Sequence, residues 1–111
     1  MRIEERLQKI EEQVGQAGNI PEETRTELLS LLAALRTEIA TLPSANDEEA
    51  RSIATFAEAS ALEATRSSVH PKLLEAALSG LEGQVEEFET SHPELAAVLN
   101  RLAVVLANMG M

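Results

Sequence analysis

The sequence predicts an all-α fold, an antiparallel bundle of about five helices that forms a single domain over residues 1–111. Five stretches of the chain place apolar residues at alternating spacings of four and three. This pattern averages about 3.5 residues per period, so each set lies along one side of a helix as a coiled-coil-like seam. The composition agrees, because leucine and alanine are abundant while aromatic residues, which favour strands, make up only 2% of the chain.

The first two predicted helices cover residues 2–16 and 21–42. Between them, Asn19 and Glu22 match a capping box, in which both side chains accept backbone N–H groups at the start of a helix. The second helix is predicted to end before Pro43, since proline interrupts a helix. The seams are Ile3, Leu7, Ile10 and Val14 in the first helix and Leu28, Leu32, Leu35, Ile39 and Leu42 in the second.

The third predicted helix, residues 47–67, has alanine at every position of its seam. Alanine lets two backbones approach closely but buries little area, so we expect this helix to be held less firmly than the others. Asn46 and Glu49 match a second capping box at its start. A proline after His70 breaks the path before the fourth helix, residues 71–90, and one kinked rod or a hairpin are both compatible with the pattern. The seams are Ala50, Ala54, Ala57, Ala61 and Ala64, then Leu74, Leu78, Leu81, Val85 and Phe88.

The fifth predicted helix covers residues 93–108 and follows a third capping signal, Ser91 with Glu94. It is apolar nearly all round, which is typical of helices that are buried on several sides. We therefore expect it to be the centrepiece of the bundle or the core of an oligomer interface. Its seam is Leu95, Leu99, Leu102, Leu106 and Met109.

The C-terminal part of the chain begins with Ser91-His92-Pro93, continues as a Leu/Ala-rich helix and closes with Asn108-Met109-Gly110 and a final methionine. This run resembles the ends of the small bacterial helical proteins of the domain of unknown function 4404 family. The resemblance extends through Phe88-Glu89 into the fourth helix and, more loosely, to the first two. It implies a compact, cytoplasmic bacterial protein and supplies no activity, ligand or catalytic residue.

The formal charge of −10, from 19 acidic and 9 basic residues, bounds the possible partners. Such a field repels nucleic acid and anionic membrane surfaces, and no Lys/Arg cluster opposes it locally. We expect neither a nucleic acid nor a membrane as partner. Cysteine is absent, which excludes disulfides and zinc–thiolate sites.

The expected location is the cytoplasm. The N-terminus is charged and amphipathic and lacks the apolar core of a signal peptide. The longest strongly apolar stretch, residues 95–109, is shorter than the roughly 20 residues that a membrane span needs.

Three patterns could suggest sites. Glu89 and His92 have the Glu-x-x-His spacing of di-iron bundles, but those centres need two such motifs, and this one straddles a helix end. Glu86, Glu87 and Glu89 could suggest paired carboxylates for acid–base catalysis, but they flank seam residues of an acidic helix and should form a solvated face. The Gly-x-x-Gly of residues 80–83 lies in an acidic helix, without the basic residues of an RNA clamp. The sequence therefore indicates no catalytic, cofactor-binding or metal-binding residue, and we expect no cofactor.

The leading hypothesis is a non-enzymatic protein that works by protein–protein contact, beginning with self-association, most simply as a dimer. It rests on the number of apolar seams in one small chain. The alternative is a helical bundle that binds a small molecule or a metal in a cavity left by the alanine-rich third helix. The residues expected to form the central packing and interaction surface are Leu28, Leu32, Leu35, Ile39, Leu95, Leu99, Leu102, Val105, Leu106 and Met109.

Overall fold

The computed structural model describes residues 3–18 and 20–110. Helices account for most of these residues, and no strand occurs among them, which confirms the predicted all-α bundle. The elements are α1 (Ile3–Gln16), α2 (Glu22–Ala40), a short 3-10 helix η1 (Ser44–Asn46), α3 (Asp47–Ala64), α4 (Pro71–Phe88) and α5 (Pro93–Gly110).

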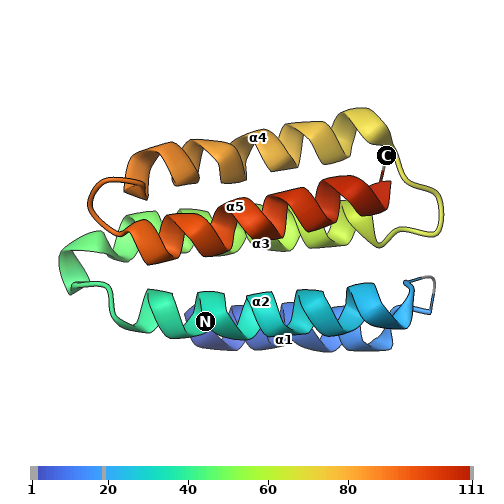
Figure 1. The fold of residues 1–111 in the computed structure, drawn as a ribbon, viewed down its shortest axis with the longest axis horizontal. Helices are drawn as coiled ribbons and strands as arrows, with labels where there is room; N and C mark the ends of the chain where they lie inside the picture. The colour runs from blue at the N-terminus through green and yellow to red at the C-terminus, as the bar shows by residue number, and fades with distance from the viewer. Residues whose placement is uncertain (1–2, 19, 111) are drawn as a thin grey trace.

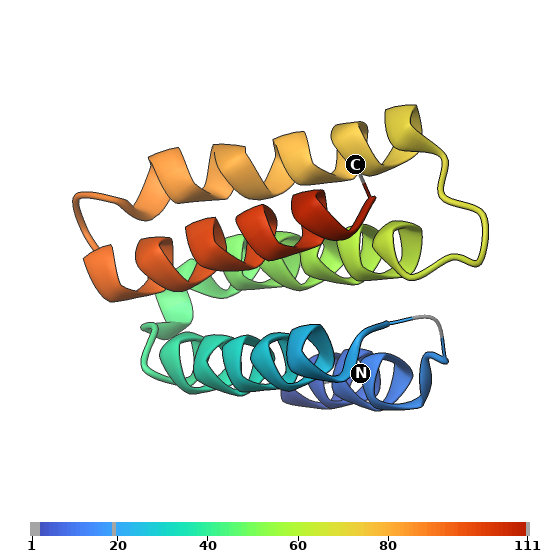
Figure 2. The ribbon, with the colours of Figure 1, turned by 45° about the vertical axis from the view of Figure 1, so that its right-hand side comes forward.

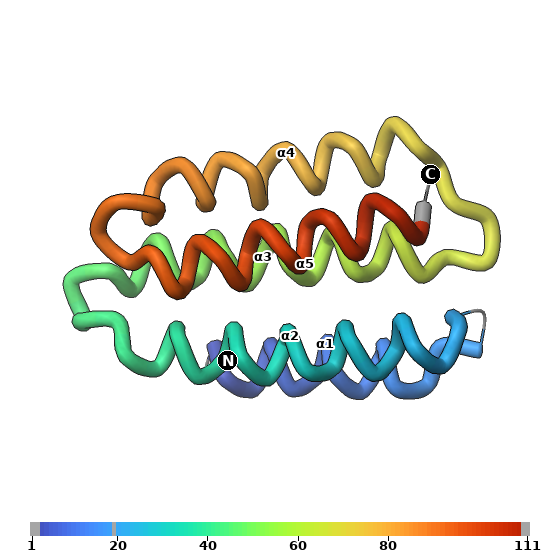
Figure 3. The backbone as a smooth tube through the Cα atoms, in the orientation of Figure 1, coloured from blue at the N-terminus to red at the C-terminus, as the bar shows by residue number. Residues whose placement is uncertain are grey.

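The five α-helices lie alongside one another in a bundle of 38 × 24 × 23 Å. Helices α1, α3 and α5 run in one direction, and α2 and α4 run in the other (Figure 3). Helices α1 and α2 form one layer, α3 and α5 the next, and α4 covers the groove between α3 and α5 (Figure 1). The two lower layers are joined because α2 packs against α5 and α1 packs against α3.

Helices α3 and α4 form an antiparallel hairpin and not one kinked rod (Figure 2). The turn comes where expected, because His70 precedes a proline and adopts an extended conformation, with φ −102° and ψ 101°. Helix α3 ends at Ala64, three residues earlier than predicted. The hydroxyl of Thr65 donates to the carbonyl of Ala61 at 2.7 Å, and such local side-chain bonds compete with continuation of a helix.

Helix α2 also ends early, at Ala40 instead of residue 42. The N–H groups of Thr41 and Leu42 donate to the carbonyls of Glu38 and Ile39, three residues back, both at 3.1 Å. This tightened last turn satisfies carbonyls that have no α-helical partner. Helix α4 ends at Phe88, two residues before its predicted end.

Two of the three predicted capping boxes are wrong. Asn46 makes no side-chain cap bond to α3, because it closes η1 with φ −101° and ψ 16° instead of the extended conformation typical of a cap. Helix α5 begins at Pro93, and its first backbone bond runs from Ala96 to the carbonyl of His92 at 3.1 Å. His92 therefore occupies the cap position predicted for Ser91. The third box involves Asn19, which lies outside the described residues.

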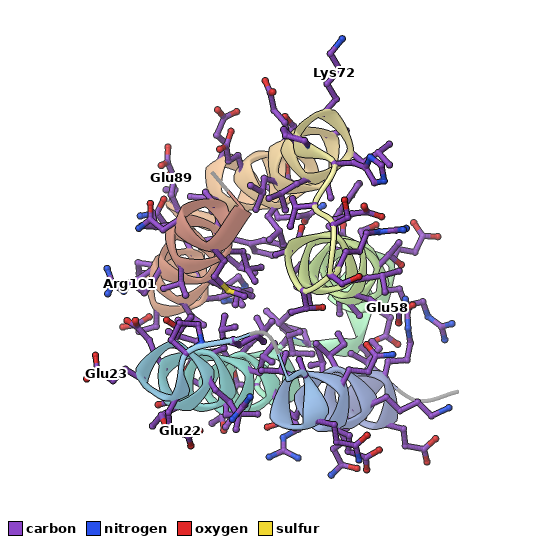
Figure 4. The ribbon with its side chains drawn as sticks, turned by 90° about the vertical axis from the view of Figure 1, so that its right-hand side faces the viewer. Glu22, Glu23, Glu58, Lys72, Glu89 and Arg101 are labelled. Atoms are coloured by element: carbon purple, nitrogen blue, oxygen red, sulfur yellow. The ribbon has the colours of Figure 1, made fainter. Side chains whose placement is uncertain are left out.

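The core is one cluster with contributions from all five helices. Helix α3 takes part through its small seam residues, which are all buried, and it is enclosed by α1, α4 and α5. Viewed along the bundle, the labelled charged side chains point outward, and apolar side chains fill the space between the helices (Figure 4). The seam residues of α3 are Ala50, Ala54, Ala57, Ala61 and Ala64.

Gly80 of α4 makes room for the ring of Phe56 on α3. A Cβ atom at position 80 would lie 2.1 Å from Cδ1 and 2.5 Å from Cγ of that ring. The ring and a methyl group cannot occupy this space together. A Cβ atom at Gly83, also on α4, would have no other atom within 4 Å. Gly80 is thus required by packing, whereas Gly83 is not.

We predict that Gly80→Ala lowers the free energy of unfolding by about 1 kcal/mol, because overpacking outweighs the gain in helix propensity. Gly83→Ala, the matched control, should raise it by up to about 1 kcal/mol. Urea unfolding followed by far-ultraviolet circular dichroism measures both. In a Phe56→Ala background, Gly80→Ala should become stabilising. Equal stabilisation by the two glycine substitutions in the wild-type chain would contradict the packing role.

Ser60 is a fully buried polar residue of α3, and its hydroxyl has no hydrogen-bond partner within the described structure. We predict that Ser60→Ala stabilises the fold by about 1–2 kcal/mol, because it removes an unsatisfied buried hydroxyl and adds helix propensity. Ser52→Ala, at a half-buried position of the same helix, should gain about 0.5 kcal/mol from propensity alone. Thermal unfolding of the two variants tests this, and a destabilised Ser60→Ala protein would show that the hydroxyl is satisfied.

Candidate functional site

A hollow of about 570 Å³ opens at one end of the bundle. It lies between the start of α2, the end of α3 with its connection to α4, and the second half of α5. Helices α2 and α3 lack extensive packing against each other, and the small side chain of Ala64 does not bridge the space at their ends. The lining residues are Pro21, Thr24, Glu27, Ala64, Arg66, Ser67, Val69, Arg101, Val105, Asn108 and Met109.

The wall of the hollow combines apolar and charged groups. Val69, Val105 and Met109 provide its larger apolar side chains, of which Val105 is buried and the other two are partly buried. Its ionisable groups are the guanidinium groups of Arg66 and Arg101 and the carboxylate of Glu27. Two of the three ionisable groups that line the hollow are therefore cationic, in a chain with a formal charge of −10.

Arg101 reaches from α5 to the neighbouring helix α2. Its Nε and Nη2 atoms donate to Oε2 of Glu27 at 3.0 and 2.6 Å, and the arginine side chain is 56% exposed. Figure 4 shows Arg101 on the outer side of α5, next to α2. Because a guanidinium group has five N–H donors, this bond to one carboxylate oxygen uses part of its capacity.

Arg66 follows the end of α3 and is held by a carboxylate one helical turn earlier. Its Nε lies 2.8 Å from Oε1 of Glu63, and its Nη2 donates to Oε2 of the same residue at 3.1 Å. A two-point contact of this kind fixes the plane of the guanidinium group as well as its position. The two arginines of the hollow are thus oriented from opposite sides, one by α3 and the other by α2.

The connection between α1 and α2, which supports the start of α2 at the hollow, is held by Arg25. Its guanidinium group donates to the carbonyl oxygens of Ala17 and Ile20, the second at 3.5 Å, and to the carboxylate of Glu22 at 2.7 Å. Ala17 and Ile20 lie in the connection outside both helices, so their carbonyls have no helical partner, and these charged hydrogen bonds replace bonds to water.

The structure places the residues expected in the central packing within the folded chain. Leu28, Leu32, Leu35, Ile39, Leu95, Leu99, Leu102, Val105 and Leu106 are buried, and Met109 is partly buried against them. Helices α2 and α5 pack directly against each other. These side chains are covered by the chain itself, so a contact with another molecule has to use other residues unless the bundle opens.

The three sequence patterns that could suggest sites do not form a common site in the structure. Glu86, Glu87 and Glu89 are exposed, as predicted. The ring of His92 packs against that of Phe88, with ring centroids 5.6 Å apart. Within residues 3–18 and 20–110, no group of three or more His, Asp or Glu side chains is placed to hold a metal ion.

The sequence does not predict the hollow residue by residue, because its lining comes from three segments far apart in the chain. The one signal is the all-alanine seam, which indicates a cavity beside the third helix. Ala64 does line the hollow, but its polar and charged groups come from the ends of other elements. No local pattern indicates that Arg66 and Arg101 share a site.

The fold and the hollow together define a small antiparallel five-helix bundle with a solvent-open end site. The chain belongs to the family described as Domain of unknown function (DUF4404), whose model matches residues 28–111. The match includes the whole of α3, α4 and α5, and α1 lies outside it. Neither a curated protein nor a solved structure matches the chain. None of the helices in the described part of the chain has the length and apolar character needed to cross a membrane.

We predict that Arg25→Gln destabilises the fold by about 1–3 kcal/mol, because hydrogen bonds from a charged group to two carbonyls are lost. Arg51→Gln, at an exposed position of α3, is the matched control and should change stability by less than about 0.5 kcal/mol. Urea unfolding measures both. Similar small effects for the two variants would show that Arg25 does not hold the connection.

Proposed function

We propose that this protein is a non-catalytic helical module that acts through contact with other proteins, and that its first partner is a second copy of the chain. The observation that carries the proposal is a pair of exposed leucines, Leu62 and Leu73, beside the connection between α3 and α4. Because the seams are covered within the chain, the surface around these two leucines, and not the core residues, is the proposed interface.

Three large apolar side chains of the described residues are exposed, and all three lie in the same half of the bundle. Leu62 is 49% exposed, Leu73 52% and Val104 41%. Leu62 lies near the end of α3 and Leu73 near the start of α4, so they flank the connection of the hairpin. Val104 lies in the second half of α5, which ends on the same side (Figure 1). Singly exposed leucines are ordinary on protein surfaces, but Leu62 and Leu73 flank the same connection, which favours a contact there.

Within α3, α4 and α5, charge also favours this half of the helices as the place where two acidic chains meet. Residues 56–79 and 102–109, the half with the exposed apolar side chains, hold three acidic and two basic groups. Residues 47–55 and 80–101, the other half of the same helices, hold eight acidic and two basic groups. Like charges repel less where their density is low, so two copies approach more easily through this half of α3, α4 and α5 than through the other half. The acidic groups of the other half are Asp47, Glu48, Glu49, Glu82, Glu86, Glu87, Glu89 and Glu94.

A second candidate function is the binding of a small molecule in the hollow. A volume of about 570 Å³ lies within the range of about 300–1,000 Å³ that is usual for ligand pockets. The combination of apolar walls with a few oriented polar groups is also typical of such pockets.

The self-association proposal is tested by size-exclusion chromatography with light scattering over a range of protein concentrations. The wild-type chain should approach twice its monomer mass at high concentration, and more readily at high salt, which screens the acidic repulsion. Leu62→Gln combined with Leu73→Gln should remain monomeric, because the apolar contact is removed.

Ala97→Gln, an exposed substitution in the first half of α5, is the control and should associate as the wild type does. A wild-type chain of monomer mass at every concentration would contradict the proposal. Unchanged association of the double variant would contradict the assignment to this surface.

A further inference from the structure

We propose that the hollow at the end of the bundle binds a small amphipathic monocarboxylate, with its carboxylate at Arg101 and its apolar part against Val69, Val105 and Met109. This inference rests on the small-molecule candidate function above and names the class of ligand. The inference rests on the volume of the hollow, its apolar walls and the remaining hydrogen-bonding capacity of Arg101.

The oriented guanidinium groups of the lining favour an anion. The lining holds two guanidinium groups, and each is paired with one carboxylate: Arg66 with Glu63 and Arg101 with Glu27. Arg66 and Arg101 are held in orientation by Glu63 and Glu27, so little side-chain freedom is lost when a ligand binds. Arg101 keeps N–H donors beyond its pair with Glu27, so an anion finds oriented charged donors in the hollow.

Arg101 has the geometry to accept a second carboxylate. Glu27 takes the Nε and Nη2 hydrogens through a single oxygen atom. The Nη1 group lies on the other edge of the guanidinium plane, and carboxylates commonly bind arginine by such an edge. The arginine side chain is more than half exposed, so a ligand carboxylate reaches it without displacing the protein core.

The remaining walls specify an apolar tail on the ligand. Val69, Val105 and Met109 lie on the same hollow, and methionine adapts its shape to different apolar groups. Thr24, Ser67 and Asn108 add hydroxyl and amide groups to the lining. Inorganic phosphate would use the arginines alone and leave this apolar surface in water. The combination therefore favours a carboxylate with an alkyl chain over a purely ionic ligand.

The test is a titration of the full-length, 15N-labelled chain, observed by the amide resonances of the residues that line the hollow. Octanoate is the probe, 1-octanol supplies the chain without the charge, and inorganic phosphate supplies the charge without the chain. Octanoate should shift the resonances of Ala64, Ser67, Val105 and Asn108 in a saturable way. Octanol and phosphate should each bind at least about tenfold more weakly, because each loses one part of the contact.

Two substitutions at the hollow should have opposite effects. Arg101→Gln should weaken octanoate binding at least about tenfold, and Glu27→Gln, which removes the competing carboxylate, should strengthen it about threefold. Arg51→Gln, distant from the hollow, should change the affinity less than about twofold. Circular dichroism establishes that each variant is folded.

Three results would overturn the inference. One is the absence of saturable shifts at the hollow with octanoate. Another is binding of octanol as tight as that of octanoate, which would support a small-molecule site but contradict recognition of the carboxylate. The third is unchanged octanoate affinity in a folded Arg101→Gln chain.

Discussion

The packing of α5 against α2, α3 and α4 is the contact on which the rest of the bundle depends. The leucines of α5 are at most 1% exposed, and the helix packs against α2 below it, α3 beside it and α4 above it. Since apolar burial is the main favourable term in folding, this central helix joins the α1–α2 pair to the α3–α4 hairpin. A second connection, α1 against α3, is bordered by Arg6, which donates to Thr55 at 3.1 Å and lies 3.7 Å from Glu58.

Small residues determine how closely α3 fits into this arrangement. Its alanines allow three helices to surround it, and Gly80 of α4 accepts the ring of Phe56. At the end of the helix, the small side chain of Ala64 leaves space unfilled and borders the hollow. One feature of the sequence thus contributes both to close packing in the middle of the bundle and to open space at its end.

The helices and their buried faces could be predicted because they follow from local spacing. The positions from Leu28 to Ile39 and from Leu95 to Leu106 are buried at the intervals that one side of a helix requires. Spacing does not show which seams face each other. The hairpin of α3 and α4 and the Phe56–Gly80 contact therefore became evident only in the three-dimensional structure. The hollow was the feature least predictable from the sequence, because Glu27, Arg66 and Arg101 become neighbours only through the tertiary fold. The caps at Asn46 and Ser91 failed for a local reason, since backbone conformation and not residue type decides which residue caps.

The central role of α5 is tested most directly by native-state hydrogen exchange of the full chain. The backbone amides of Leu99 and Leu102 should exchange only through global unfolding, with an opening free energy equal to that from urea unfolding. Exchange of these two amides at a clearly lower free energy, while the amides of α3 and α4 stay protected, would contradict the account. It would mean that the other helices remain folded together without α5.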